Sequence, residues 1–412
     1  MEVVYERCCG LDIHKKLIVA CLIVPGPKQQ PRKELRTFGT MTADLEQLAA
    51  WLTAEGVSHV AMESTGSYWK PVFNQLEDRF QLLLANAQHL RAVPGRKTDV
   101  KDAEWIADLL RHGLLKASFV PDRSQRELRE LVRYRASLTQ ERTASSNRLQ
   151  KVLEGANIKL SSVATDILGK SGRDILQALV SGQEQPQVLA ELARGRLREK
   201  LPELERALAG RFGAHQRFLV ARILAHIDFI DETIEQLSTE IGARERPFEE
   251  AVERLDTIPG VGRTTAEIVI AEVGVDVRRF PTVGHLVSWA GLCPGSDESA
   301  GKRRSGKTRK GNRWLRTTLI QAAHAVSRSK DSYLAVQFRR LAARRGAKKA
   351  AVAVAHSILA IIYHLMLDGH DYIDLGPDYF DDRNRAALSR QLQRRLERLG
   401  YRVHLEPITS AA

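Results

Sequence analysis

The chain has 412 residues, of which 43% are hydrophobic and 6% aromatic. A chain of that length is too long to fold around a single hydrophobic core, so two or three domains are expected. The hydrophobic content excludes a wholly disordered chain. Lys and Arg number 63 against 50 Asp and Glu, a net charge of +13 that favours a nucleic acid partner over a merely basic soluble protein.

Residues 1–118 alternate strand and helix signals. Their order predicts an α/β layered domain of three strands, a helix, a strand, a helix, a strand and a helix. Thr42 is expected to cap the first helix, which Gly56 ends. The predicted strands lie within residues 3–13, at 17–24, around 37–38, at 57–63 and at 80–85, and the last helix covers residues 98–112.

Residues 119–255 predict a helical coiled-coil region. Seven apolar residues are spaced 3, 4, 3, 4, 3 and 4 apart, which is typical of a coiled-coil seam: Val220, Ile223, Ile227, Ile230, Ile234, Leu237 and Ile241. A weaker seam runs from Leu128 to Val152. The two helices can pair within one chain or between subunits. Pairing between subunits is favoured because a long seam on an arm needs a partner, so we expect a homo-oligomer, a dimer or a tetramer.

Residues 256–370 predict a third, mainly helical unit, and residues 371–412 a loosely held tail with one short helix. The longest apolar run, residues 350–367, reads as a buried helix and not as a membrane span. No signal peptide pattern begins the chain. The cysteines form no C-x-x-C pair, which argues against a zinc site and predicts a reducing, cytoplasmic compartment without membrane contact: Cys8, Cys9, Cys21 and Cys293.

Four acids are the candidate catalytic residues. Asp12 lies in the first strand and Glu63 ends a buried strand, while Asp99 and Asp102 share one face of the last helix of the α/β domain. Carboxylates that converge at a sheet edge repel one another unless a cation neutralises them, and oxygen ligands suit Mg²⁺ or Mn²⁺. Each acid taken alone is more simply a surface or helix-start residue. The ordered set resembles the ribonuclease H-like (RuvC-like) fold of Holliday-junction resolvases.

Five segments together resemble the DEDD-type transposases of insertion sequences. Residues 10–15, 62–66 and 97–103 carry the four acids, and residues 258–262 and 289–294 are similar to the C-terminal transposase domain of that family. The resemblance implies a prokaryotic DNA recombinase, nucleoid-associated when it acts. It also implies that an RNA encoded by the element, a bridge RNA, pairs donor and target DNA.

The resemblance further implies a serine nucleophile that forms a covalent phosphoserine–DNA intermediate. Counting from the Gly-Leu-x-Pro segment at residues 291–294 places the nucleophile at Ser299, with Ser296 and Ser305 as neighbouring alternatives. A serine hydroxyl needs a base or a metal to activate it, and no histidine neighbours Ser299 in sequence. Cations held by the distant carboxylates would therefore serve that purpose.

Two further segments are candidate nucleic-acid contacts. Residues 301–313 contain seven basic side chains, no acid and three glycines, which predicts a mobile loop that binds phosphates: Lys302, Arg303, Arg304, Lys307, Arg309, Lys310 and Arg313. Gly260, Gly262 and Arg263 form a sequence similar to a helix-hairpin-helix motif, whose backbone N–H groups approach a phosphate. A solvated charge run and a tight turn are the plainer interpretations.

Two apparent motifs are rejected. Gly169–Lys170–Ser171 suggests a nucleotide-binding P-loop, but the earlier glycine is replaced by Ala164 and no strand leads in. The histidines at 324, 356 and 364 lie on apolar helical stretches and read as packed or surface residues.

The sequence therefore predicts a metal-dependent DNA recombinase with a serine nucleophile. Two alternatives remain: a junction resolvase or nuclease that uses activated water, and a non-catalytic RNA- or DNA-binding protein.

Overall fold

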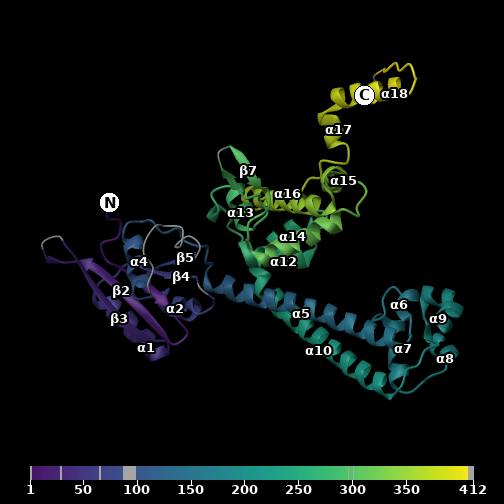
Figure 1. Ribbon diagram of the computed structural model, residues 1–412, viewed down its shortest axis with the longest axis horizontal. Coiled ribbons are helices and arrows are strands. Elements are labelled where there is room, and N and C mark those ends of the chain that lie inside the picture. The colour runs from purple at the N-terminus through teal and green to yellow at the C-terminus, as the bar shows by residue number, and fades with distance from the viewer. Residues whose placement is uncertain are drawn as a thin grey trace. The chain divides into compact units, whose positions relative to one another are not determined.

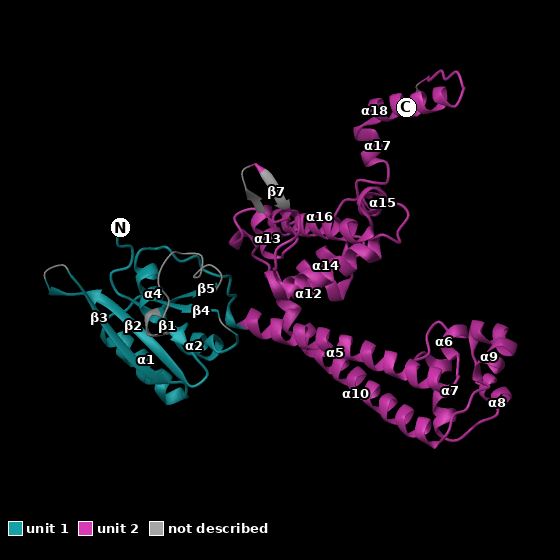
Figure 2. Ribbon diagram, viewed as in Figure 1, with its two compact units in different colours: residues 1–123 teal, residues 124–412 magenta. Residues whose placement is uncertain are grey.

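The chain forms two compact units, residues 1–123 and residues 124–412 (Figure 2). The computed structural model describes residues 2–27, 30–64, 66–86, 99–295, 297–299 and 301–406, with the backbone alone at 99–101, 297–299 and 302–304. The first unit mixes strands and helices and the second is mostly helical, as the sequence predicts.

The first unit is built on a five-stranded sheet of order β3-β2-β1-β4-β5. Its first three strands pair antiparallel, whereas β4 pairs parallel with β1 and with β5. The strands are β1 (Cys8–Ile13), β2 (Leu17–Pro25), β3 (Pro31–Gly39), β4 (His59–Glu63) and β5 (Gln81–Ala85). The helices are α1 (Thr42–Ala54), α2 (Trp69–Leu76) and α4 (Asp99–Arg111).

The two faces of this sheet bury different cores. Because successive strand residues point to opposite faces, Cys9 and Leu11 of β1 join a core with α1 and α2, whereas Cys8 joins a second core with α4. Gly10 lies on the α4 face, where a Cβ would be 2.4 Å from the carbonyl oxygen of Ala103. The helix α4 therefore lies directly against the backbone of β1.

The second unit contains two long helices that lie side by side, α5 (Arg123–Gly155) and α10 (Ala214–Glu245) (Figure 1). Arg142 pairs with Asp231, and Arg244 Nη1 lies 3.1 Å from Glu127 Oε2, so the two helices run antiparallel. The predicted seam is confirmed as a single helix, but it packs on α5 of the same chain. Three of the seven seam residues are only partly buried, namely Ile223, Ile234 and Leu237, and the expected pairing between subunits stays a prediction.

A small helical cap lies between the two long helices in the chain, in the stretch that the sequence left uninterpreted. Its elements are α6 (Leu160–Val163), α7 (Lys170–Val180), α8 (Pro186–Ala190), the 3-10 helix η2 (Gly195–Lys200) and α9 (Leu201–Leu208). Ile175, Leu176 and Leu204 are fully buried with Leu149 of α5 and Val220 of α10. The cap thus shares one core with the ends of both long helices.

The remaining helical region follows α10. Its elements are η3 (Arg246–Phe248), α11 (Glu249–Asp256), α12 (Arg263–Val273), η4 (Val277–Arg279), α13 (Val283–Trp289), β6 (Asp297–Ser299), β7 (Lys302–Ser305), α14 (Arg313–Val326), α15 (Tyr333–Arg345) and α16 (Ala347–Asp368). Within the described part of the chain, only α16 is long and apolar enough to cross a membrane, by length and composition alone. Val354, Ile358 and Ile362 of α16 are fully buried in this unit, as in a core helix.

The tail contains two helices where the sequence predicted one at best. They are α17 (Tyr379–Arg383) and α18 (Arg385–Arg398). The Phe380 ring stacks on Tyr333 at 5.0 Å, which attaches α17 to α15. By contrast, α18 buries none of its residues.

Candidate active site

Asp12 and Glu63 lie at the same edge of the sheet and on the same face. Leu11 of β1 pairs with Met62 of the parallel strand β4, so the next residue on each strand is an acid. Leu11 and Met62 are buried in the core beneath α1 and α2. Because side chains alternate along a strand, Asp12 and Glu63 belong to the opposite face, which α4 covers.

The direction of α4 brings its first turn toward these two acids. Cys8 Sγ lies 3.8 Å from the carbonyl oxygen of Ala107, and Gly10 meets Ala103, four residues earlier on the helix. β1 and α4 therefore run in opposite directions, so that the end of β1 at Asp12 lies toward the N-terminus of α4. The first turn of α4 begins at Asp99, whose side chain lies outside the described residues.

Two of the other predicted acids influence the charge state of Asp12. Burial raises the pKa of Asp12, His14 lowers it, and the carboxylates of Asp102 and Glu63 raise it. The Asp12 side chain is 13% exposed, and its Oδ2 lies 3.1 Å from Nε2 of His14. Asp12 thus lies within electrostatic range of both Glu63 and Asp102.

The donor chemistry of this region fits a hard cation. Carboxylate oxygens are the ligands that Mg²⁺ and Mn²⁺ prefer. Burial chiefly raises the pKa of Asp12, with a smaller contribution from neighbouring carboxylates, and a divalent cation would offset both effects. Among the described side chains, however, no three acids, histidines or cysteines lie close enough to hold one ion. The Asp99 carboxylate, the fourth predicted ligand, is not among those side chains.

Sequence reasoning assigned no role to His14. Its contact with Asp12 follows from an alternation that the sequence contains, because residues two apart on a strand share a face. The loop after β1 begins at this histidine, whose backbone N–H donates to the carbonyl of Leu17 at 2.9 Å. The imidazole can thus orient the Asp12 carboxylate.

Ser299 lies in the second unit, in a two-stranded hairpin. It ends β6 and pairs with Lys302 of β7, while Gly301 between them has a φ of +73°. Of the two alternatives, Ser305 lies at the far end of β7 and pairs with Asp297, and its hydroxyl accepts from Lys307 N at 3.1 Å. Ser296 lies outside the described residues. The side chain of Ser299 is likewise not described.

The base of this hairpin is closed by direct backbone contact between two glycines. A Cβ at Gly311 would lie 2.3 Å from the backbone nitrogen of Gly291, so neither position has room for a side chain. Gly295 N donates to the carbonyl of Lys307 at 2.9 Å, one step nearer the hairpin. The Gly-Leu-x-Pro segment and the end of the basic stretch are thereby held side by side.

The basic stretch is partly a strand and not the fully mobile loop that the sequence predicted. Lys302, Arg303 and Arg304 belong to β7, because the glycine at 301 supplies the turn and β6 supplies a pairing edge. The other four basic residues of the stretch are exposed and make no ion pair with any residue that the structure describes: Lys307, Arg309, Lys310 and Arg313. These cations are therefore available to phosphates.

The predicted helix-hairpin-helix segment is a turn between α11 and α12. Gly260 has a φ of +85°, and a Cβ there would lie 2.6 Å from the carbonyl oxygen of Ala322 on α14. Gly262 caps α12, is exposed and has open space around it. Arg263 pairs with Glu249 at 2.6 Å and with Glu267 at 3.2 Å. Gly262 is thus the member of the set most open to a ligand.

The rejected motifs lie in ordinary surroundings. Gly169–Lys170–Ser171 begins α7, and the element before it is the helix α6, so no strand leads into it. The ring of His324 packs edge-on against Phe338, and burial lowers the pKa of His356. All four cysteines are free.

Comparison with known proteins places these segments in a family. A family model described as a transposase matches residues 9–158, and the model of the transposase IS116/IS110/IS902 family matches residues 252–338. The transposase for insertion sequence element IS1111A of Coxiella burnetii is 28% identical, over 89% of this chain and 91% of its own length. An uncharacterised protein of insertion element IS110 from Streptomyces coelicolor is 27% identical, over 68% and 73% of the two chains. A putative transposase of Sinorhizobium fredii is 26% identical, over 76% and 74%.

Proposed function

Because this chain belongs to the IS110 family of insertion-sequence transposases, which act in DNA transposition, we propose that it cuts and rejoins donor and target DNA with carboxylate-bound cations and a serine nucleophile. The observation that carries the proposal is the placement of Asp12 and Glu63 at one edge of the sheet, on the face that the Asp102-bearing helix α4 covers. We further propose that the first unit is a ribonuclease H-like domain, residues 1–118. The regions that follow are a coiled-coil region to residue 255, a transposase domain to residue 370 and a tail.

Asp12, Glu63, Asp99 and Asp102 are proposed to hold Mg²⁺ or Mn²⁺. The family suggests a divalent metal, and the clustered carboxylates support that chemistry. When bound, such cations polarise a phosphodiester and lower the pKa of a hydroxyl that attacks it. His14 contributes by fixing the orientation of the Asp12 carboxylate, whose Oδ2 it contacts at 3.1 Å.

Ser299 is proposed as the nucleophile. Its Oγ attacks a backbone phosphorus, so that an Oγ–P ester forms while one strand P–O bond breaks and leaves a free hydroxyl on the DNA. Attack by a hydroxyl of the other DNA on that ester reseals the backbone and returns the serine. No energy source is needed, because one phosphodiester is exchanged for another. The basic sequence that follows Ser299 supports the proposal, since cations in that segment would hold the attacked phosphate.

The partners follow from charge and family. Lys307, Arg309, Lys310 and Arg313 are proposed to bind DNA phosphates together with residues 302–304, and Gly260, Gly262 and Arg263 to form a sequence-independent contact. We propose that a bridge RNA encoded by the element pairs the donor and target DNA, that the protein acts in the cytoplasm at the nucleoid, and that it works as a homo-oligomer. Sequencing the RNA that co-purifies with the protein tests the guide directly.

Substitution of Ser299 decides the chemistry. Purified protein, its co-purified RNA, labelled donor and target DNA and Mg²⁺ are combined, and covalent adducts are separated under denaturing conditions. Ser299→Ala is expected to abolish both the protein–DNA adduct and strand exchange, whereas the matched control Ser305→Ala retains them. A Ser299→Ala protein that still cleaves indicates hydrolysis by activated water. Recombination by the Asp12→Asn protein would reject the proposed metal site. If the unsubstituted protein does not cut DNA under any of these conditions, its role is binding alone.

A further inference from the structure

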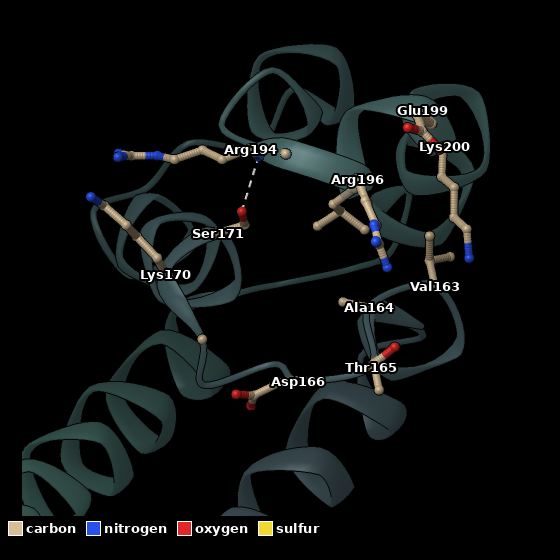
Figure 3. A pocket seen from close by; sticks show the side chains of 13 residues that line it. Val163, Ala164, Thr165, Asp166, Lys170, Ser171, Arg194, Arg196, Glu199 and Lys200 are labelled. Atoms are coloured by element: carbon tan, nitrogen blue, oxygen red, sulfur yellow. Dashed lines mark hydrogen bonds between the residues drawn. The ribbon is translucent and has the colours of Figure 1, made fainter.

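The helical cap of the second unit contains a groove to which no function has been assigned so far. Its walls come from α6, from the start of α7 and from η2, and it encloses about 600 Å³ (Figure 3). One side of the groove is open to solvent. It is lined by residues 163–166, 169–171, 194–197, 199 and 200. The cap that contains the groove follows the C-terminal end of α5 and precedes the N-terminal end of α10. Ser299, by contrast, belongs to the region that follows the C-terminal end of α10.

The lining carries more positive than negative charge. Four basic residues line the groove, and of these Arg194 pairs with Asp174 at 2.6 Å. The other three make no ion pair within the described part of the chain: Lys170, Arg196 and Lys200. The two acids of the lining are Asp166 and Glu199. Three cations without an acidic partner in one concave surface favour an anionic ligand.

The backbone of the groove adds donors of its own. The helix α7 begins at its rim with Gly169 as the N-cap, a residue that has no side chain to bond the N–H groups of the first turn. Free N–H groups at the start of a helix attract phosphate. Ser171 Oγ accepts a hydrogen bond from Arg194 N at 3.0 Å, which ties the α7 wall to the η2 wall. Gly169–Lys170–Ser171, rejected as a P-loop, is therefore part of a concave basic surface.

We propose that this groove binds the sugar–phosphate backbone of a nucleic-acid strand. No aromatic side chain is among the lining residues, so a base would find nothing to stack on, which favours contact with the backbone over a bound nucleotide. The open side lets a strand pass through and continue beyond the cap. The inference rests on the proposed function only in taking a nucleic acid as the partner, which can be the RNA or one of the DNA strands.

The test compares two triple substitutions in the full chain. The groove variant replaces Lys170, Arg196 and Lys200 with Gln. The control variant replaces three exposed basic residues of α5 and α10 that are also outside any ion pair with the described residues: Arg148, Lys151 and Arg222. Both variants lose the same charge. Binding to a uridine RNA strand and a thymidine DNA strand of about 20 nucleotides is measured against salt concentration, with thermal unfolding as the check on folding.

The groove variant is expected to bind one of the two strands about tenfold or more weakly, with a log–log salt slope reduced by about 2, because each phosphate contact contributes about 0.7. The strand with the larger loss identifies the source of the backbone. If the groove and control variants lose equal affinity for the strands, the proposal that the groove binds the backbone is wrong. If the unsubstituted protein binds neither strand, the proposed function fails as well, so the two failures are distinct. A photoreactive residue in place of Thr165 should crosslink to the bound strand, and its failure to do so while binding persists would also reject the groove.

Discussion

Asn312 Nδ2 donates a hydrogen bond of 2.6 Å to Oε2 of Glu272, a carboxylate that is fully buried in α12. The same Asn312 accepts from two backbone N–H groups at the start of α14, where the basic stretch ends. Arg133 of α5 binds the Glu272 carboxylate with two hydrogen bonds, at 2.6 and 2.9 Å. One buried acid thus connects α5, α12 and the end of the segment that carries Ser299.

Replacement of Glu272 should be costly. Glu272→Gln removes the buried negative charge that Arg129 and Arg133 contact, and the expected loss is about 2–4 kcal/mol of unfolding free energy. Denaturant unfolding followed by circular dichroism measures the loss. The control Glu240→Gln removes an exposed partner of Arg244 and should cost less than about 1 kcal/mol. Equal effects of the two substitutions would contradict the proposed role of Glu272.

Stability of the second unit should fall as the pH rises, because of Glu245. Both its carboxylate oxygens are buried without a hydrogen-bond partner in the described structure. Burial and the neighbouring carboxylates of Glu267 and Glu249 raise the pKa of Glu245 to about 8, despite Arg135 and Arg263. Its ordinary pKa of 4.5 applies in the unfolded chain, so folding takes up a proton between these values and stability decreases from about pH 4.5 to about pH 8.

Glu245→Gln should remove that dependence. The melting temperature of the variant is expected to match that of the unsubstituted protein at about pH 5 and to exceed it at about pH 9. The corresponding difference in unfolding free energy at about pH 9 is up to a few kcal/mol. Differential scanning calorimetry across this range measures the difference. Parallel melting curves of the two proteins at every pH would show that Glu245 is not the group responsible.

Packing of α4 on β1 should tolerate no side chain at position 10. A Cβ at Gly10 would lie 2.4 Å from two backbone atoms of α4, so Gly10→Ala must displace the helix that carries Asp99 and Asp102. The expected cost is about 1–3 kcal/mol, with a loss of DNA cleavage. Gly242→Ala is the control, because that glycine of α10 has open space and Ala is the better helix former by up to about 1 kcal/mol. Unfolding and cleavage assays on both variants test the contrast.

Removal of one clustered acid should stabilise the protein when divalent metal is absent. Asp12→Asn relieves the repulsion from Asp102 and Glu63, so the variant is expected to melt higher than the unsubstituted protein in a chelator. Added Mg²⁺ should raise the melting temperature of the unsubstituted protein and leave that of the variant nearly unchanged. An equal shift in both proteins would place the bound cation elsewhere.

The succession of strands and helices in the first unit and the sheet face of Asp12 could be predicted from the sequence, because both follow local rules. Alternation along β1 fixes the face of Asp12, and an acid that ends an apolar strand, as Glu63 does, lies at a sheet edge. The family resemblance was needed for Ser299, since nothing about a serine in a polar segment distinguishes it. Its hairpin was missed because β6 and β7 pair through a register that a glycine-rich basic sequence does not reveal.

The partner of the α10 seam was beyond sequence reasoning for a different reason. Heptad spacing predicts that Ile227 and Ile230 are buried, but it does not identify the chain that buries them. The apolar pattern of α5 is interrupted by Arg135 and Arg142, so the sequence does not identify α5 as the partner. The groove of the cap was equally out of reach, because the turns between short helices are what bring Lys170 and Arg196 to the lining of one groove.

The antiparallel pairing of α5 and α10 also makes the reach of the cap adjustable. With a rise of about 1.5 Å per residue, the 33 residues of α5 extend over about 50 Å. Deleting a matched heptad from both helices would draw the cap inward by about 10 Å while preserving the seam and both of its ends. The length of the paired helices thus sets the distance of the cap from the helical region that follows α10. That distance can be changed by engineering without redesigning either part.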